Sequence, residues 1–154
     1  LQTDKIKIAI EKTNQEIPSV NICLEDGTWS GLTFHGVPGG HEFTSFILGI
    51  YNVAGPGQKI EQTYLERIDK INKEINIKII VSLSCTMCPE LVTSAQRIAS
   101  LNKQITTEVY DIQHFKQLKD QYQIMSVPCM VINDQKVVFG KKNIEQILEI
   151  IENV

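Results

Sequence analysis

The stretch IKIIVSLSCTMCPE, residues 77–90, decides the fold, because its hydrophobic pattern changes from one period to another within a few residues. Residues 77–83 are rich in β-branched side chains and predict a mostly buried strand. From Pro89 onward the apolar residues recur at helical spacing, and a proline is well tolerated in the first turn of a helix. The sequence therefore predicts a strand that leads directly into a helix, with Cys85 and Cys88 at the junction.

This junction suggests a chemical role for the two cysteines. In an open α/β sheet the turn from strand to helix lies at the carboxyl edge, where such folds place their sites. The unpaired N–H groups and the dipole of the helix N-terminus favour a negative sulfur on Cys85, and the thiolate is the nucleophilic form. Cys88 lies one turn further along and is expected to be the more buried, resolving thiol. We therefore predict a redox-active dithiol.

Zinc binding is the main alternative for a C-x-x-C pair. A structural zinc site needs four ligands, commonly with a second pair of ligands at short spacing. The other candidate ligands are scattered along the chain and unpaired: Cys23, His35, His41, His114 and Cys129. The spacing favours redox chemistry, and we predict no metal site. Assembly of an iron–sulfur cluster on the dithiol is a further, less favoured alternative.

The segments after the dithiol continue an alternating pattern. The predicted elements are a strand at 105–112, a short helix around 115–122, hairpin strands at 130–132 and 136–139, and a final helix from residue 143. Asn143 and Gln146 have the spacing of a capping box at the start of that helix. The predicted order from residue 77 onward is β-α-β-α-β-β-α.

The first part of the chain repeats a portion of this order. An Ile-Pro-Ser segment at 17–19, strands at 20–24 and 29–35 and a helix near 42–51 parallel the segments that follow residue 127. Upstream, Ile6, Ile8 and Ile10 alternate as in a strand. We interpret residues 1–57 as a partial first unit without a dithiol and residues 58–154 as the unit that carries it. Chance similarity of two β-β-α units is the alternative.

Composition excludes several classes of protein. The 154 residues carry 15 Lys and Arg against 18 Asp and Glu, a net charge of −3, and the interspersed charges predict no basic surface for nucleic acid. No run of about 18 apolar residues predicts a membrane span. The N-terminus lacks the pattern of a secretory signal. We expect a cytoplasmic protein whose thiols are normally kept reduced.

Two sequence pieces together point to a family. The strand, the C-x-x-C-P helix and the Val127-Pro128 dipeptide before a hairpin resemble the thioredoxin/glutaredoxin superfamily. Residues 38–45 (PGGHEFTS) and 82–89 (SLSCTMCP) are more specific and look like the N-terminal domain of the alkyl hydroperoxide reductase flavoprotein subunit. The resemblance is good over residues 34–154 and weaker over 4–33. It implies an α/β, thioredoxin-like fold of two fused thioredoxin-type units, of which the first is incomplete here and lacks a C-x-x-C motif.

The resemblance also implies roles for individual residues. Cys85 would attack the disulfide of an oxidised peroxiredoxin, and Cys88 would resolve the mixed disulfide. Pro128 would be a cis-proline facing the dithiol, with Val127 offering backbone groups to the partner chain. Glu42 matches an acidic residue that the family places near the dithiol, which makes it a candidate base for Cys88 or a residue that tunes the pKa of Cys88.

The electron donor that the family implies is a reductase that binds FAD and NAD(P)H. The chain has no G-x-G-x-x-G segment, so we expect no cofactor on this chain and place FAD and NAD(P)H on a partner reductase or on a missing C-terminal domain. The chain is then either a fragment of a longer flavoprotein or a stand-alone shuttle. The unpaired strand edges of a truncated first unit would allow a homodimer.

Alternatives stay open for one cysteine and for the function. Cys129 follows the predicted cis-proline and is either a small buried core residue that faces away from Cys85 or an auxiliary thiol. The alternatives to the disulfide relay are a glutaredoxin-like reductase that uses a small thiol as donor and a non-catalytic domain that docks partners.

Overall fold

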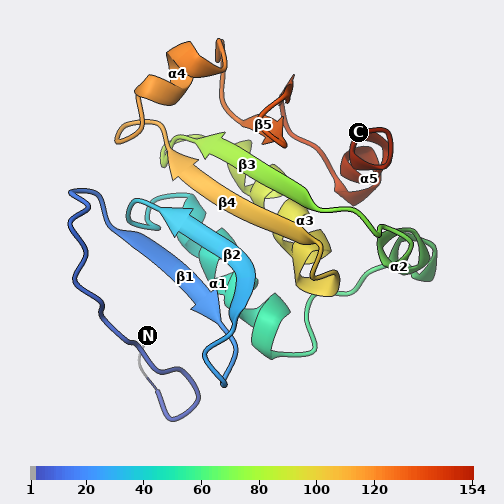
Figure 1. Ribbon diagram of the computed structural model, residues 1–154, viewed down its shortest axis with the longest axis horizontal. Helices are drawn as coiled ribbons and strands as arrows, with labels where there is room; N and C mark the ends of the chain where they lie inside the picture. Colours follow the sequence, from blue (N-terminus) through green and yellow to red (C-terminus); the bar gives the residue numbers. More distant parts are fainter. Residues whose placement is uncertain (1–2) are drawn as a thin grey trace.

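The computed structural model describes residues 3–154 and contains one mixed six-stranded sheet with helices packed against it (Figure 1). The strands are β1 (Ser19–Cys23), β2 (Trp29–His35), β3 (Ile75–Val81), β4 (Ile105–Asp111), β5 (Cys129–Ile132) and β6 (Lys136–Phe139). The helices are α1 (Glu42–Ala54), α2 (Gln62–Asp69), α3 (Cys88–Leu101), α4 (Gln117–Gln121) and α5 (Ile144–Glu152).

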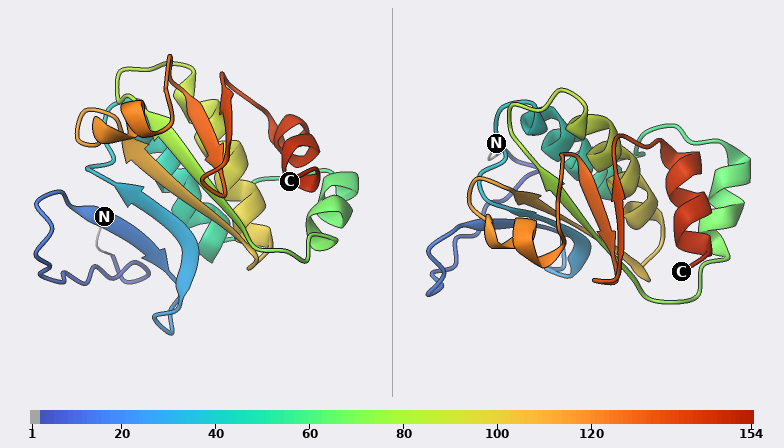
Figure 2. Two further views of the ribbon diagram at one scale, coloured as in Figure 1. Left: turned by 45° about the horizontal axis from the view of Figure 1, so that its top comes forward. Right: turned by 90° about the horizontal axis from the view of Figure 1, so that it is seen from above.

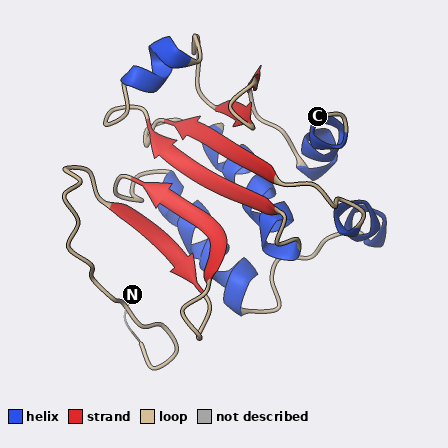
Figure 3. Cartoon of the chain, in the orientation of Figure 1, coloured by secondary structure: helices blue, strands red, loops and turns tan. Residues whose placement is uncertain are grey.

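The strand order β1-β2-β4-β3-β5-β6 determines where the candidate site lies. β2, β4 and β3 run parallel, whereas β1, β5 and β6 are antiparallel to their neighbours. Helices α1 and α3 pack side by side on one face of the sheet, and α4 lies on the opposite face (Figure 2). The loops that follow β2 and β3 and the loop that precedes β5 therefore meet at one edge of the sheet (Figure 3).

The central strand β3 supplies core side chains to both faces, as its run of β-branched residues predicts. Ile77 and Ile79 are fully buried beneath the helices on one face. Ile80 points to the other face because side chains alternate along a strand, and there it joins a second apolar cluster with Leu118 and Tyr122. The predicted strand before the C-x-x-C motif is confirmed.

The order β-α-β-α-β-β-α predicted from residue 77 onward is confirmed by β3 through α5. The capping box is also confirmed. The Asn143 side chain accepts a hydrogen bond from the backbone N–H of Gln146 at 2.9 Å, and the Gln146 side chain accepts one from the N–H of Asn143 at 3.0 Å. These reciprocal bonds pair two of the N–H groups that a helix start leaves free.

The strand expected around Ile6, Ile8 and Ile10 is wrong. Residues 6–13 form no strand, and the side chains of Ile8 and Ile10 are 53% and 88% exposed. Alternation alone does not make a strand, because a strand also needs a hydrogen-bonding neighbour and an apolar face to cover. In the described part of the chain, β1 is the edge of the sheet and pairs with β2 only.

The first 57 residues extend the sheet of the remaining residues, since β2 pairs in parallel with β4. The order β1-β2-α1 matches the order β5-β6-α5, as the predicted repeat requires. A division of the chain at residue 57 stays a prediction. The elements form a thioredoxin-like α/β architecture with a mixed sheet.

Candidate active site

The two cysteines of the C-x-x-C motif lie where β3 gives way to α3. Cys88 is the first residue of α3 and is fully buried, while Cys85 precedes the helix by three positions and is half-buried. A turn in which the Cys85 N–H donates to the carbonyl oxygen of Ser82 at 3.0 Å shapes the loop. One sulfur is thus accessible and the other lies behind it, as the sequence predicts.

The loop before β5 faces Cys85. The Val127–Pro128 peptide bond is cis, which confirms the predicted cis-proline. The Cys85 thiol lies 4.0 Å from the carbonyl oxygen of Val127. Pro128 is buried, and its carbonyl oxygen accepts a hydrogen bond from the N–H of Gly140 at 2.9 Å, which ties the loop to the end of β6. The structure therefore brings Val127 and Pro128 against the dithiol.

Burial strongly raises the pKa of the Cys88 thiol. Its hydrogen bond with Cys85 raises this pKa further, a hydrogen bond from the Ser82 backbone lowers it, and the charges of Cys85 and Glu42 have smaller raising effects. A thiolate in such a place lacks the water that would stabilise its charge. Cys88 therefore holds its proton until a group close by accepts it.

Glu42 is the acidic residue whose charge acts on Cys88, and it is fully buried at the start of α1. Neither of its carboxylate oxygens has a hydrogen-bond partner among the described residues. Burial raises the pKa of Glu42 from 4.5 to about 7, with only a smaller opposing effect from Ser45 one turn away. A carboxyl group that titrates near neutrality can both take up and release a proton under working conditions.

A glycine explains how α1 brings Glu42 to this place. Gly40 has a φ of +54°, and a Cβ atom there would clash with the backbone carbonyl of Leu83. The same carbonyl oxygen accepts a hydrogen bond from the N–H of His41 at 2.9 Å. The start of α1 is therefore fixed directly to the loop that carries Cys85, which is the structural reason for the Gly-Gly-His-Glu sequence.

Cys129 lies on the other side of the sheet from the dithiol. Its fully buried side chain belongs to the cluster with Ile80, Leu118 and Tyr122, and burial raises the pKa of its thiol to about 11. The expectation that Cys129 faces away from Cys85 is confirmed. All four cysteines are free thiols, and Cys23 is exposed at the end of β1.

A polar cluster that the sequence did not predict lies on the sheet face opposite α1 and α3. His35, considered above only as a possible metal ligand, bonds the Glu108 carboxylate at 2.9 Å and stacks on Tyr110 with ring centroids 4.1 Å apart. The Asn76 amide donates to the second oxygen of Glu108 at 2.9 Å. Asn76, Glu108 and Tyr110 alternate with buried residues along β3 and β4, which is the signal that could have found them, whereas β2 gives no such signal for His35.

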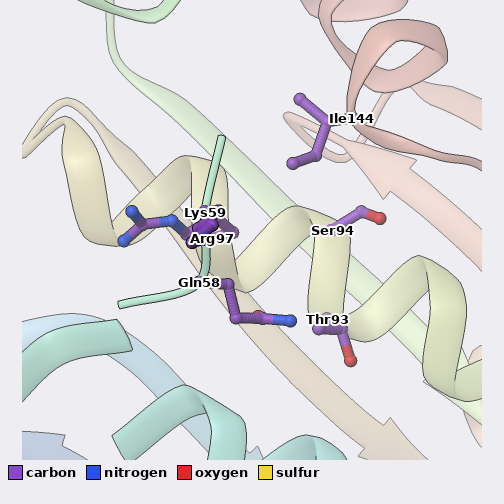
Figure 4. A pocket seen from close by; sticks show the side chains of 6 residues that line it. All are labelled: Gln58, Lys59, Thr93, Ser94, Arg97 and Ile144. Atoms are coloured by element: carbon purple, nitrogen blue, oxygen red, sulfur yellow. The ribbon is translucent and has the colours of Figure 1, made fainter. Parts of the chain in front are cut away.

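Two hollows of the surface lie away from the dithiol. A small one of about 80 Å³ lies over the middle of α3 (Figure 4). Its lining residues are Gln58, Lys59, Thr93, Ser94, Arg97 and Ile144. None of these is a predicted site residue.

Two further observations concern residues 3–154 only. No group of three or more His, Cys, Asp or Glu side chains in this part of the chain is placed to hold a metal ion. None of its helices combines the length and the apolar character that a membrane span requires.

The model of the thioredoxin domain family matches residues 75–152, which is about half of the chain and contains the dithiol. The chain belongs to the thioredoxin domain family. This thioredoxin domain protein is 34% identical over 145 residues to a Bacillus subtilis protein named NADH dehydrogenase. It is 33% identical over 146 residues to the alkyl hydroperoxide reductase protein AhpF of Pseudomonas aeruginosa.

A solved structure supports the same relationship. The NTD_N/C domain of alkylhydroperoxide reductase AhpF from Enterococcus faecalis is 40% identical and superimposes with a TM-score of 0.83. That match covers 92% of the thioredoxin domain protein and 66% of the solved chain. The resemblance to the N-terminal domain of the alkyl hydroperoxide reductase flavoprotein is therefore confirmed. The chain nevertheless spans only 28% of the length of each of the two curated relatives.

Proposed function

We propose that this protein is a thiol–disulfide oxidoreductase that relays two electrons through Cys85 and Cys88 to a disulfide of a peroxiredoxin. The observation that carries the proposal is the pairing of a half-buried Cys85 with a buried Cys88, opposite a cis Val127–Pro128 bond. The similarity to the alkyl hydroperoxide reductase protein AhpF supports the choice of a peroxiredoxin as acceptor.

The chemistry balances as two exchanges. The Cys85 thiolate attacks one sulfur of the acceptor disulfide, so that a mixed disulfide forms and one acceptor thiolate leaves. Glu42 in its carboxylate form takes the proton of Cys88, whose thiolate then attacks Cys85 and expels the second acceptor thiolate. The acceptor ends as a dithiol and this chain as a Cys85–Cys88 disulfide, with two electrons transferred.

In this proposal the backbone groups of Val127 receive the acceptor chain. The carbonyl oxygen of Val127 lies 4.0 Å from the Cys85 thiol and has no backbone donor among the described residues. An extended acceptor segment that hydrogen-bonds to Val127 would bring its own sulfur onto Cys85. We interpret residues 1–57 as an incomplete first thioredoxin-type unit without a dithiol. This step does not require them.

The electrons come from a reductase that carries FAD and NAD(P)H, on a partner protein or on a further part of a longer chain. The lengths of the curated relatives support this choice, because this chain covers 28% of each. Neither of the two exchanges uses a cofactor bound to this chain.

A reduction assay tests the proposal. The reduced protein should convert an oxidised peroxiredoxin to its dithiol, and Cys85→Ser should abolish that turnover. Turnover by Cys85→Ser at the wild-type rate would reject the catalytic role and favour a docking domain. Turnover sustained by glutathione alone would favour the glutaredoxin-like alternative.

A further inference from the structure

The interface between α1 and α3 holds buried polar atoms that have no hydrogen-bond partner among the described residues. They are both carboxylate oxygens of Glu42, the hydroxyl oxygen of Ser45 and the amide oxygen of Gln96. A buried polar atom that makes no hydrogen bond destabilises a fold, so such a group needs an explanation. When Glu42 is ionised, only the Ser45 oxygen among these atoms carries a hydrogen that it can donate.

The spacing along α1 places Ser45 beside Glu42. Ser45 follows Glu42 by three residues, and residues three apart on a helix are neighbours on one face. The same face continues at Gly49, where a Cβ atom would lie 2.9 Å from the amide oxygen of Gln96 on α3. Glu42 and Ser45 therefore both face α3, the helix that begins with Cys88.

The titratable groups that face Glu42 are those of the dithiol. The charge of Glu42 acts on Cys88, Cys85 lies in the loop that leads into α3, and His41 next to Glu42 is exposed. The other titratable side chains of α1 and of the elements around it lie elsewhere: Cys23 at the exposed end of β1, His35 on the opposite face of the sheet, Tyr51 in the last turn of α1, Glu90 in a surface ion pair, Arg97 against Gly57, and Asp111 beside His114. Because no ion pair among the described residues offsets the charge of Glu42, a hydrogen bond is the remaining way to stabilise its carboxylate.

We propose that Ser45 is a positioning residue for the resolution of the mixed disulfide, because its hydroxyl donates a hydrogen bond to the Glu42 carboxylate that takes the proton of Cys88. The bond is made to the charged form of Glu42, and catalytic hydrogen bonds of this kind are often long in the resting protein and shorten when the charge forms. Ser45 already lowers the pKa of Glu42 against the larger effect of burial. The proposal rests on the proposed function, since it concerns the base of the second exchange.

In this exchange the S–H bond of Cys88 breaks and the proton goes to a Glu42 oxygen. The Cys88 thiolate attacks the sulfur of Cys85, the Cys85–Cys88 bond forms, and the acceptor leaves as a thiolate with the electron pair of the broken mixed disulfide. Ser45 keeps its own proton throughout. Without the Ser45 hydroxyl the carboxylate is less stable, so the pKa of Glu42 rises and less carboxylate is present at a given pH.

Stopped-flow reaction of the reduced protein with the aromatic disulfide dithiobis(nitrobenzoate) separates the two exchanges. All proteins carry Cys23→Ser, which removes the other exposed thiol and defines the parent. The first thionitrobenzoate released reports the attack by Cys85, and its rate depends on the concentration of the reagent. The second reports the attack by Cys88 within the mixed disulfide, and its rate does not depend on that concentration.

Ser45→Ala removes one buried oxygen and keeps a good helix former. The second release should become about threefold to tenfold slower at pH 6 and stay within about twofold of the parent at pH 9, because the pKa of Glu42 moves up by about 0.5–1 pH unit. The first release should stay within about twofold at both pH values. Thr44→Ala, which removes the exposed neighbouring hydroxyl, is the matched control and should change neither release. In a Glu42→Gln background, Ser45→Ala should have no further effect on the second release.

The outcomes separate the role of Ser45 from the proposed function. An unchanged pH profile in Ser45→Ala, a fall of the same size at every pH, or an equal loss in the Glu42→Gln background would overturn the role of Ser45 while the two exchanges stand. A parent protein that releases only the first thionitrobenzoate would overturn the proposed function, and the role of Ser45 with it.

Discussion

Replacing Glu42 with Gln is expected to stabilise the reduced protein at alkaline pH and to change its stability little at acidic pH. The carboxyl is fully buried and has no hydrogen-bond partner among the described residues, so its charged form carries a much larger penalty in the folded state than its neutral form. Glutamine has nearly the same shape and stays neutral at every pH. The variant therefore removes the charge without emptying the space.

The size of the effect follows from the pKa of Glu42, which burial raises from 4.5 to about 7. A raised pKa means that the folded state binds the proton more tightly than the unfolded state does. The stabilisation by that proton is complete below the unfolded value and is lost as the pH rises through the folded value. At about 1.4 kcal/mol per pH unit, the loss amounts to roughly 3 kcal/mol, most of it between pH 5 and pH 8.

Urea unfolding of the reduced proteins at pH 5 and pH 8 measures this difference. The free energy of unfolding of Glu42→Gln relative to wild type should rise by about 2–3 kcal/mol from pH 5 to pH 8. Glu90→Gln is the matched control, because Glu90 also lies in the first turn of a helix but its side chain is 48% exposed. If the free energies of unfolding of wild type and Glu42→Gln changed in parallel with pH, Glu42 would not be desolvated and the prediction would be wrong.

Two further predictions concern the loop contacts and the thiols. Gly40→Ala should lower the free energy of unfolding by about 2–4 kcal/mol, because it adds a backbone clash to the cost of a positive φ. Gly140→Ala is the control, because Gly140 has a φ of +86° but open space around it, and it should lower the free energy of unfolding by only about 1–2 kcal/mol. Equal losses in urea unfolding would argue against the close approach of Gly40 to Leu83. Iodoacetamide should modify Cys85 in the folded reduced protein, whereas Cys88 and Cys129, both fully buried, should react only after unfolding. Mass spectrometry of the peptides checks this order, which rapid labelling of Cys129 would contradict.

The sequence predicted the half of the chain around the dithiol because its signals are local. A β-branched run before C-x-x-C, the helical spacing after Pro89 and the capping pair at Asn143 and Gln146 each act within a few residues. The resemblance to a known family predicted the cis bond before Pro128, which the spacing of apolar residues does not indicate.

The features that the sequence did not predict depend on partners that are distant in the chain. Ile8 and Ile10 alternate correctly for a strand but have no neighbouring strand. His35 and Glu108 are 73 positions apart in the sequence and meet only because β2 and β4 are neighbouring strands. The burial of Glu42 depends on the close approach of Gly40 to the loop after β3, and a first-turn glutamate is otherwise only a complement to the helix dipole.

Cys85 is proposed to attack the acceptor disulfide and Cys88 to resolve the mixed disulfide, and trapping that mixed disulfide separates the two roles. Reduced Cys88→Ser is mixed with a peptide disulfide, quenched with acid, and analysed by mass spectrometry before and after proteolysis. We expect a stable adduct of one peptide half linked to Cys85. An adduct on another cysteine instead, or an equal yield of adduct from Cys85→Ser, would contradict it.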